Sequence, residues 1–410
     1  MSDGLIKIAV IGGGAAGMIC AGTAVAYGAD VTVFEATDRL GKKLGITGKG
    51  RCNVTNDCDI NAFMENVTRN PRFLYTALNT LSPSDTIEFF KNLGVELKTE
   101  RGNRVFPVSD KAKTVVDALR AYSKGAKCIY SKVKSVKVSD DGGFTVTCDS
   151  EYRFDKVVIA TGGKSYPLTG SDGSGYKLAS ELGHSITPLI PSLVPIECCG
   201  TLCPDMMGLS LKNVSIRILD GAEKELYRDF GEMLFTHFGV SGPMILSASS
   251  NIRSHNISEL TLSIDLKPAL DEATLDKRLL SDFAERSNKD FINVLGALLP
   301  TKMITPFLTY TGLDGRKKVN LITKEERKII IHALKNFKIK LKKLRPIEEA
   351  IITSGGVEVK EVSPKTMESK LCPGLYFAGE VLDLDAYTGG FNLQIAFSTG
   401  YLAGMSAAQY

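Results

Sequence analysis

The stretch that decides the fold runs from Lys7 to Ala36 and reads KIAVIGGGAAGMICAGTAVAYGADVTVFEA. Its start, residues 8–11, is a short apolar run typical of a strand that is buried on both faces. A G-x-G-x-x-G turn follows, and the small apolar residues after it predict a helix over 15–27. Residues 31–34 form a second apolar run that ends in Glu35. This succession predicts a strand–turn–helix–strand unit.

Each glycine of the turn has a physical role. Gly12 allows the tight turn out of the strand, and Gly14 has no β-carbon, so a pyrophosphate can approach the backbone. Gly17 lets the helix pack closely on the sheet, and the start of the helix offers unpaired amides to phosphates. Glu35 stands where a carboxylate accepts hydrogen bonds from an adenosine ribose. We therefore favour a dinucleotide site over a βαβ turn without a ligand.

The bulk properties are those of an ordinary globular protein. A chain of 410 residues predicts two or three domains, and a net charge of +4 does not argue for nucleic acid. Nine scattered cysteines fit a reducing cytoplasm, and we expect neither a signal segment nor a membrane span. Cys198, Cys199 and Cys203 have no histidine nearby, which favours a structural role over a metal site.

A loop rich in glycine and cations follows the acid, over residues 39–56. Such a composition is typical either of a backbone that lies against a ligand or of a basic solvent loop. We favour the ligand because the loop comes directly after the fingerprint. Its polar end, with Arg51, Asn53 and Thr55, could hold a flavin ring or a diphosphate.

The middle of the chain alternates between helical and extended patterns. Residues 71–100 look helical, and Asp141-Gly142-Gly143 predicts a hairpin turn. An apolar strand over 157–160 ends in Thr161-Gly162-Gly163, a second place where a backbone can approach a dinucleotide. Prolines 188, 191 and 195 indicate a domain boundary. Beyond it we expect strands at 209–219, 225–230 and 260–266, and helices at 271–299 and 323–336. The lysine-rich run 335–345 is interpreted as a solvated edge.

The closing segment repeats the order of strand, glycine turn and helix found at the amino terminus. Residues 374–380 predict a strand that ends in Gly379 and Glu380, and 387–394 lead into an apolar helix that reaches Ala403. The amides at the start of that helix could face the pyrimidine edge of a flavin, where they would stabilise negative charge.

Six motifs together resemble a known family: GGGAAG, GKGRCNVTN, ATGG, GEMLFTHFGVSGP, TSGGV and GLYFAGEVLDLDAYTGGFNLQ. The chain is similar to the BaiN/YhiN-type (aminoacetone oxidase-like) NAD(P)/FAD-dependent oxidoreductases, which are flavoproteins of the glutathione-reductase fold. Lys49 and Ala386 depart from the family pattern, where glycine is usual.

The resemblance implies an α/β fold, in which a Rossmann-like FAD-binding domain carries an inserted β-barrel domain. The FAD-binding domain would comprise residues 1–190 and 347–410, and the insert 191–346, with a small helical subdomain at about 270–325. FAD would be bound non-covalently. Cys52 is the one plausible point of covalent attachment, and we favour attachment there less. The cofactor-binding residues carried over from the family are Gly12, Gly14, Ala15, Ala16, Glu35, Ala36, Lys43, Arg51, Cys52, Asn53, Val133, Thr161, Gly162, Gly379, Glu380, Asn392, Leu393 and Gln394.

The resemblance also implies hydride transfer between flavin N5 and a small-molecule substrate. We expect reduction of a C=C bond conjugated to a ketone, in a steroid or bile-acid-like molecule, with Tyr387 and then His237 as candidate proton donors. Because the chain has one dinucleotide fingerprint, NAD(P)H would bind only transiently as donor. Two alternatives stay open: an amine or amino-acid oxidase that uses oxygen, and a non-catalytic FAD-binding redox partner, for example in RNA modification. The modest charge argues against RNA, and the oligomeric state is left open.

Overall fold

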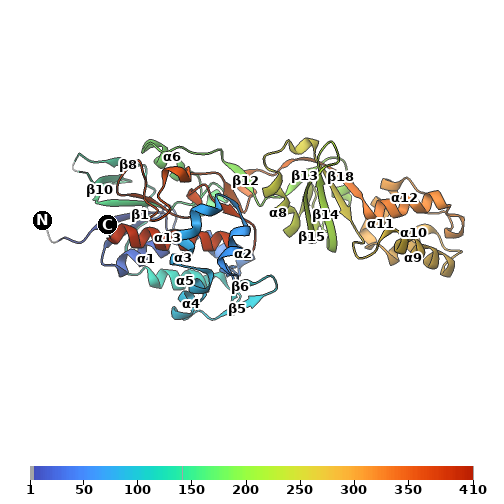
Figure 1. The fold of residues 1–410 in the computed structure, drawn as a ribbon, viewed down its shortest axis with the longest axis horizontal. Coiled ribbons are helices and arrows are strands. Elements are labelled where there is room, and N and C mark those ends of the chain that lie inside the picture. The colour runs from blue at the N-terminus through green and yellow to red at the C-terminus, as the bar shows by residue number, and fades with distance from the viewer. Residues whose placement is uncertain (1–3, 141, 410) are drawn as a thin grey trace. The chain divides into compact units, whose positions relative to one another are not determined.

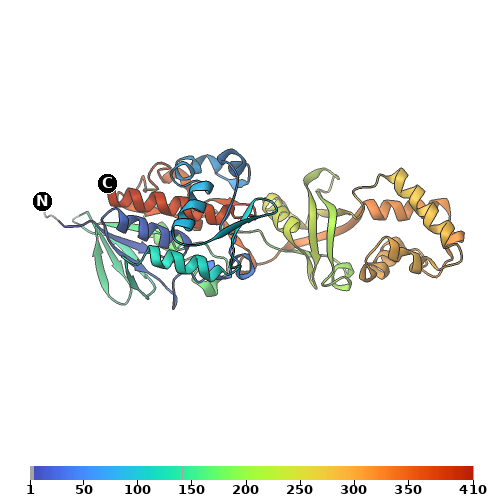
Figure 2. The ribbon, with the colours of Figure 1, turned by 90° about the horizontal axis from the view of Figure 1, so that it is seen from below.

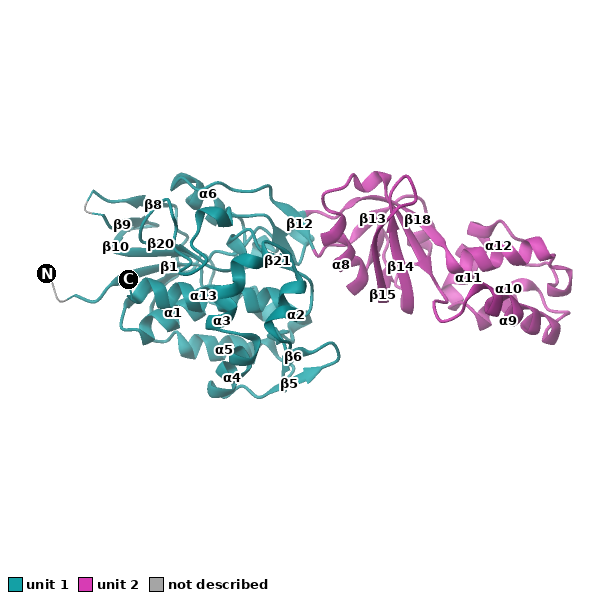
Figure 3. Cartoon of the chain, in the orientation of Figure 1, with its two compact units in different colours: residues 1–192, 347–410 teal, residues 193–346 magenta. Residues whose placement is uncertain are grey.

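The computed structural model describes residues 4–140 and 142–409. The chain divides into two compact units (Figure 3). We call residues 1–192 with 347–410 the Rossmann unit and residues 193–346 the barrel unit. The chain therefore leaves the first unit once, completes the second, and returns.

A five-stranded parallel sheet forms the centre of the Rossmann unit, in the order β20-β11-β1-β2-β7. The strands are β1 (Lys7–Ile11), β2 (Asp30–Phe34), β7 (Lys127–Ile129), β11 (Lys156–Ile159) and β20 (Leu375–Phe377). Residues 8–11 of β1 are buried, as a central strand covered on both faces requires. Helix α1 (Ala15–Ala26) connects β1 to β2, which confirms the predicted βαβ unit.

Helix α13 (Phe391–Gln409) brings the end of the chain against α1 (Figures 1 and 2). Two glycines spaced four apart make this approach possible. An ideal β-carbon on Gly400 would lie 2.5 Å from the carbonyl oxygen of Ala16, and one on Gly404 would lie 2.3 Å from that of Cys20. Larger residues at these positions would push the two helices apart, so the sequence of α13 determines how closely it packs on α1.

Smaller elements surround the sheet. They are β3 (Thr55–Asn56), α2 (Ile60–Glu65), β4 (Val67–Arg69), α3 (Tyr75–Thr80), α4 (Pro83–Asn92), β5 (Leu97–Glu100), β6 (Arg104–Pro107), α5 (Ala112–Tyr122), β8 (Ser135–Val138), β9 (Phe144–Thr147), β10 (Glu151–Phe154), α6 (Ser174–Glu181), β12 (Ile190–Ser192), β19 (Ile352–Ser354) and β21 (Asp385–Ala386). Strands β8, β9 and β10 form an antiparallel meander. The predicted hairpin turn includes Asp141, which lies outside the described residues.

The expectation of helix over 71–100 is wrong in two places. The helical stretch is interrupted at Leu81, and α4 begins anew with a capping box in which Ser82 and Asp85 bond each other's backbone amides. Residues 97–100 are a strand, β5, because they pair antiparallel with β6. The long-range pairing overrides a local pattern that looked helical.

The barrel unit is a closed barrel with strand order β13-β16-β15-β14-β17-β18. Its elements are β13 (Ile196–Cys198), α7 (Leu202–Asp205), β14 (Ser210–Leu219), β15 (Glu225–Phe235), β16 (Gly239–Ser241), α8 (Pro243–Ile252), β17 (Thr261–Asp265), α9 (Glu272–Glu285), α10 (Phe291–Val294), α11 (Thr301–Thr311), α12 (Lys324–Lys335) and β18 (Phe337–Leu344). In β18, Phe337, Ile339 and Leu341 are buried while the intervening lysines are more exposed, as on a solvated strand. The predicted fold class, a Rossmann-like α/β domain with a β-barrel, is confirmed.

Candidate functional site

The fingerprint turn leaves open space at one of its glycines and none at the other two. An ideal β-carbon on Gly12, whose φ is +106°, would lie 2.5 Å from the carbonyl oxygen of Ala160. One on Gly17 would lie 1.8 Å from the carbonyl oxygen of Gly12. At Gly14, the N-cap of α1, it would meet nothing within 4 Å, and no side chain caps the helix. The first turn of α1, with Ala15 and Ala16, thus offers amides beside a cradle that a pyrophosphate fits.

Glu35 is buried beneath this turn and already holds part of it. Its Oε2 accepts a hydrogen bond from the Gly13 amide at 2.9 Å, and its Oε1 accepts two from Thr37, from the amide and the hydroxyl, each at 2.7 Å. A carboxylate has about four acceptor positions, so about one remains on Oε2 for a ligand. The predicted role toward a ribose stays a prediction, and Glu35 has a second role in fixing the fingerprint turn at Gly13 and the segment after Ala36 at Thr37.

Two further predicted residues carry buried polar atoms without a partner among the described residues. These atoms are Oδ1 of Asn53, in the loop after β2, and Oγ1 of Thr161, directly after β11. Native proteins rarely bury polar atoms without a partner. Gly162 follows with φ of +74°, which keeps the backbone free of a side chain at this point. The residues present therefore fit a polar cofactor beside the fingerprint.

Lys43 and Glu380 form an ion pair between segments that are distant in sequence. The ammonium of Lys43 lies 2.7 Å from Oε2 of Glu380 and 2.8 Å from the hydroxyl of Ser165. The other carboxylate oxygen, Oε1, accepts a 2.9 Å hydrogen bond from the amide of Thr353. The sequence reasoning named Lys43 and Glu380 but missed Ser165 and Thr353. Thr353 stands in the TSGG motif, whereas Ser165 follows the ATGG motif without a pattern of its own.

Arg51 and Cys52, both predicted near the cofactor, have protein surroundings of their own, and their roles toward FAD stay predictions. The guanidinium of Arg51 lies 2.5 Å from carboxylate oxygens of both Glu100 and Asp110, and it stacks over Phe106 at 4.2 Å. These three residues belong to the β5–β6 region, so Arg51 is not brought to the Lys43–Glu380 pair. Burial raises the pKa of the Cys52 thiol to about 12, which keeps it protonated and unreactive.

The start of α13 presents backbone amides, but not at every predicted position. The side chain of Asn392 bonds the backbone of Ala386 in both directions, at 3.0 and 2.7 Å, and so fixes the loop before the helix. The backbone amide of Gln394 donates a hydrogen bond to the carbonyl of Gly390. Its side chain forms hydrogen bonds with Leu81, Thr55, Thr86 and Ser398. A direct cofactor contact by Gln394 therefore has no free donor, whereas the amides of Asn392 and Leu393 belong to the first turn of α13, where a helix supplies no partner of its own.

The remaining predicted residues lie in several places. Val133 is buried in the connection between β7 and β8, and Gly379 has φ of +77° and donates its amide to Thr399. Tyr387 follows β21, half-buried, and its amide donates to the carbonyl of Asn66 at 3.0 Å. His237 is exposed in the turn between β15 and β16 of the barrel unit. The two candidate proton donors therefore belong to different units.

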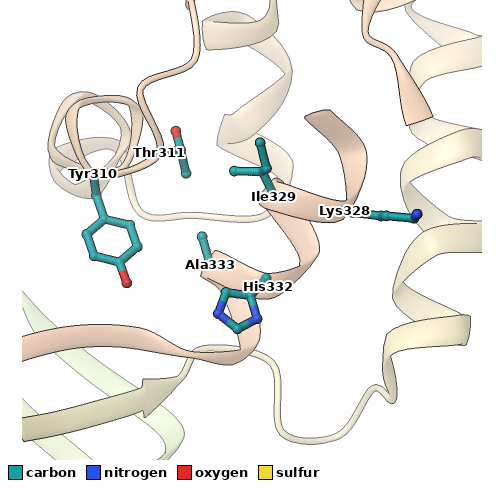
Figure 4. A pocket seen from close by; sticks show the side chains of 6 residues that line it. All are labelled: Tyr310, Thr311, Lys328, Ile329, His332 and Ala333. Carbon is teal, nitrogen blue, oxygen red and sulfur yellow. The ribbon is translucent and has the colours of Figure 1, made fainter. Parts of the chain in front are cut away.

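The barrel unit has a surface pocket of its own, of about 430 Å³, between α11 and α12 (Figure 4). The hydroxyl of Tyr310 in its wall is occupied, because it donates to Asn336 and accepts from the amide of Lys338. The lining residues are Tyr310, Thr311, Lys328, Ile329, His332 and Ala333, none of them among the predicted site residues.

Two other features are absent among residues 4–140 and 142–409. No three histidine, cysteine or acidic side chains there are grouped as metal ligands. Within the same residues, no helix combines the length and apolar character that crossing a membrane requires.

Comparisons with known proteins extend over nearly the whole chain. A family model described as HI0933-like protein Rossmann domain matches residues 6–406. A 3-dehydro-bile acid delta(4,6)-reductase of Clostridium scindens is 32% identical, with 98% of this chain and 99% of that protein covered. A ribosomal RNA dihydrouridine synthase of Escherichia coli is 30% identical, with 96% and 95% covered.

Solved structures show the same fold at low identity. A 3-ketosteroid-delta4-(5alpha)-dehydrogenase of Rhodococcus jostii RHA1 aligns with a TM-score of 0.54 and 15% identity, over 100% of this chain and 99% of that one. A flavocytochrome c3 fumarate reductase aligns with a TM-score of 0.52 and 17% identity, over 99% and 78%. Together with the full-length match to the family model, these findings confirm the resemblance: the chain belongs to the HI0933-like family, the BaiN/YhiN-type FAD-dependent oxidoreductases.

Proposed function

We propose that this oxidoreductase reduces a C=C bond conjugated to a carbonyl group in a steroid-like small molecule. The observation that carries the proposal is the 32% identity, over the full length of both proteins, to a bile-acid delta(4,6)-reductase. The dihydrouridine synthases support the same reaction type, since dihydrouridine is uridine whose ring C=C bond, next to a carbonyl, has been saturated. Both names describe the addition of two hydrogen atoms to an activated double bond.

The chain's own residues would bind FAD, orient the substrate beside it and supply a proton to the substrate. Bound FAD supplies the two-electron hydride chemistry. Gly14 and the first turn of α1 would hold the diphosphate, and the Lys43–Glu380 pair would fix the loop after β2 beside it. The amides of Asn392 and Leu393 carry the positive end of the α13 dipole, which favours negative charge at that place.

Tyr387 is our candidate for the proton that the substrate's α-carbon needs. Its loop is held by the Asn392 side chain and by the bond from its own amide to Asn66, so the position of its Cα is well defined. His237 remains the second candidate. We further propose NAD(P)H as electron donor, bound transiently because no second dinucleotide fingerprint occurs in the sequence.

A second candidate substrate is a uracil base in RNA. Two dihydrouridine synthases are 30% identical over 96% and 98% of this chain. The distribution of charge between the two units also favours RNA, although the total charge of the chain is small. The barrel unit has 23 basic and 18 acidic residues, whereas the Rossmann unit has 27 basic and 28 acidic residues. The excess of positive charge thus lies on the inserted unit, as a phosphate-binding surface would require.

The test is a comparison of acceptors for the purified holo-protein. Consumption of NADH or NADPH would be followed with a 4-ene-3-ketosteroid, with a uridine-containing RNA, and with neither. Release of hydrogen peroxide in the presence of amines would be measured in parallel. The proposal expects turnover that depends on the ketosteroid. Turnover only with RNA would favour the second candidate, and peroxide release with amines would contradict both.

A further inference from the structure

We propose that the hydroxyl of Ser171 is a ligand of the adenosine–diphosphate half of FAD. Ser171 lies in the loop before α6 and is only 4% exposed. Its Oγ is buried without a hydrogen-bond partner among the described residues. A buried hydroxyl without a partner is costly, so its presence points to a partner that binds there.

The surroundings of Ser171 are those of the cofactor site. An ideal β-carbon on Gly162 would lie 3.2 Å from Oγ of Ser171, a tight approach, so glycine at 162 keeps a side chain off this hydroxyl. Thr161, the residue before it, contributes the second buried hydroxyl without a partner. The two hydroxyls therefore belong to segments that meet at Gly162, in the turn that follows β11.

The residue before Ser171 lies close to Glu35, the acid that we predict to bind the ribose. Gly170 has φ of +95°, and an ideal β-carbon on it would lie 3.0 Å from Thr37 and 3.6 Å from Oε1 of Glu35. The Ser171 loop thus lies on the Oε1 side of the Glu35 carboxylate, whose remaining acceptor position is on Oε2. A donor and acceptor hydroxyl beside that carboxylate matches the hydroxyl groups of a ribose and the oxygens of a diphosphate.

The loop is also held rigidly enough to present a fixed hydroxyl. The amide of Gly173 donates to the carbonyl of Gly163 at 3.1 Å. The carboxylate of Asp172 accepts from the amide of Ser174 at 2.9 Å and from the ammonium of Lys132 at 2.5 Å. Asp172 is therefore occupied by these partners, which leaves Ser171 as the polar side chain of this turn that has none.

The inference rests on FAD binding and not on the reduction of a particular substrate, so its test uses binding alone. Full-length protein stripped of FAD would be titrated with FAD, with ADP and with riboflavin. For Ser171→Ala we expect roughly tenfold weaker binding of FAD and of ADP, as for the loss of one hydrogen bond, and unchanged binding of riboflavin. Failure of all ketosteroid turnover would leave these results unaffected.

Two variants and a stability measurement complete the design. Ser263→Ala removes another buried hydroxyl without a partner, in β17 of the barrel unit, and should leave FAD affinity unchanged. Ser171→Cys keeps the size with a weaker hydrogen-bonding group and should fall between serine and alanine. The stripped Ser171→Ala protein should unfold at no lower urea concentration than the parent. Unchanged FAD affinity, as expected if a water molecule satisfies Ser171, or a loss of stability without loss of ADP binding, would overturn the proposal.

Discussion

Lys43 and Glu380, separated by 337 positions in the sequence, form an ion pair whose Nζ–Oε2 distance is 2.7 Å. Both side chains are about one-fifth exposed. The pair joins the glycine-rich loop after β2 to the turn after β20, so the two ends of the Rossmann unit are held together at the candidate cofactor site. Residues at the beginning and end of the chain thus build one site.

We predict that Glu380→Gln lowers the free energy of unfolding by about 1–3 kcal/mol, because Lys43 and the amide of Thr353 lose a charged acceptor. Urea unfolding of protein without FAD measures this. The matched control is Asp117→Asn, which breaks the exposed Lys113–Asp117 pair of α5 and should cost about 0.5 kcal/mol or less. Equal effects of the two changes would contradict the structural role of Glu380.

Gly14→Val should abolish FAD binding and leave the fold intact. The φ of Gly14 is −79° and its ψ is −165°, a conformation that valine adopts readily, and no protein atom stands within 4 Å of the added β-carbon. The branched side chain would instead fill the space we assign to the pyrophosphate. The cofactor content of the purified protein and its thermal unfolding decide this. Gly296→Val, also in open space, is the control; a yellow Gly14→Val protein would refute the assignment.

Tyr387→Phe should slow the oxidative half-reaction by about a hundredfold, because a positioned acid typically contributes that much. The change keeps the ring and removes only the hydroxyl, so FAD content and the reductive half-reaction should stay as in the parent. Rapid mixing of each variant with a ketosteroid measures the two steps separately, and Tyr130→Phe, an exposed tyrosine, is the control. If the rates are equal, Tyr387 has no part in protonation and His237→Gln is the next variant.

Stability should fall as the pH drops below about 6.5, in part because of His184. Its side chain is fully buried, with Nε2 2.8 Å from Ser369 and Nδ1 3.2 Å from Glu361, and burial lowers its pKa despite the nearby carboxylate. The unfolded chain then binds more protons than the folded chain between the lowered and the ordinary pKa. The contribution is complete above the ordinary value and is lost as the pH falls through the lowered one.

Urea unfolding between about pH 5 and pH 8 measures this dependence for the parent and for His184→Gln. The variant should show a flatter profile in this range, whereas His255→Gln, at an exposed position, should keep the parent's profile. A parent whose stability does not change below pH 6.5 would contradict the assignment to His184.

Local patterns predicted the fingerprint unit well, because the βαβ turn depends on residues within thirty positions of each other. The closed barrel was expected only from the family resemblance, since its strands pair across helices that the pattern does not order. The break at Leu81 was missed, although Ser82, Pro83 and Asp85 form a capping signal that could have located it. Strand β5 was missed because its pairing with β6 is not visible in its own composition.

The sequence allowed us to name residues of the candidate site, but it did not show which partners their side chains contact. Glycines and amides could be named from the motifs, because their role depends on the backbone. The partners of charged side chains could not: Arg51 pairs with Glu100 and Asp110, and Gln394 is used by four residues of the core. Thr353 stands in the TSGG motif, but its bond to Glu380 comes from segments that meet only in the folded chain. Ser165 and Ser171 had no pattern of their own.

Reduction of an activated C=C bond by this protein is tested most directly in a single turnover without NAD(P)H. The holo-protein, photoreduced under anaerobic conditions with EDTA as the sacrificial donor, would be mixed with one equivalent of a 4-ene-3-ketosteroid, and the products would be identified by mass spectrometry. We predict that the flavin is reoxidised and that the steroid gains two hydrogen atoms at its C=C bond, with its carbonyl intact. A flavin that stays reduced with the ketosteroid and with uridine-containing RNA, and that only oxygen reoxidises, would rule out the proposed reduction of a C=C bond.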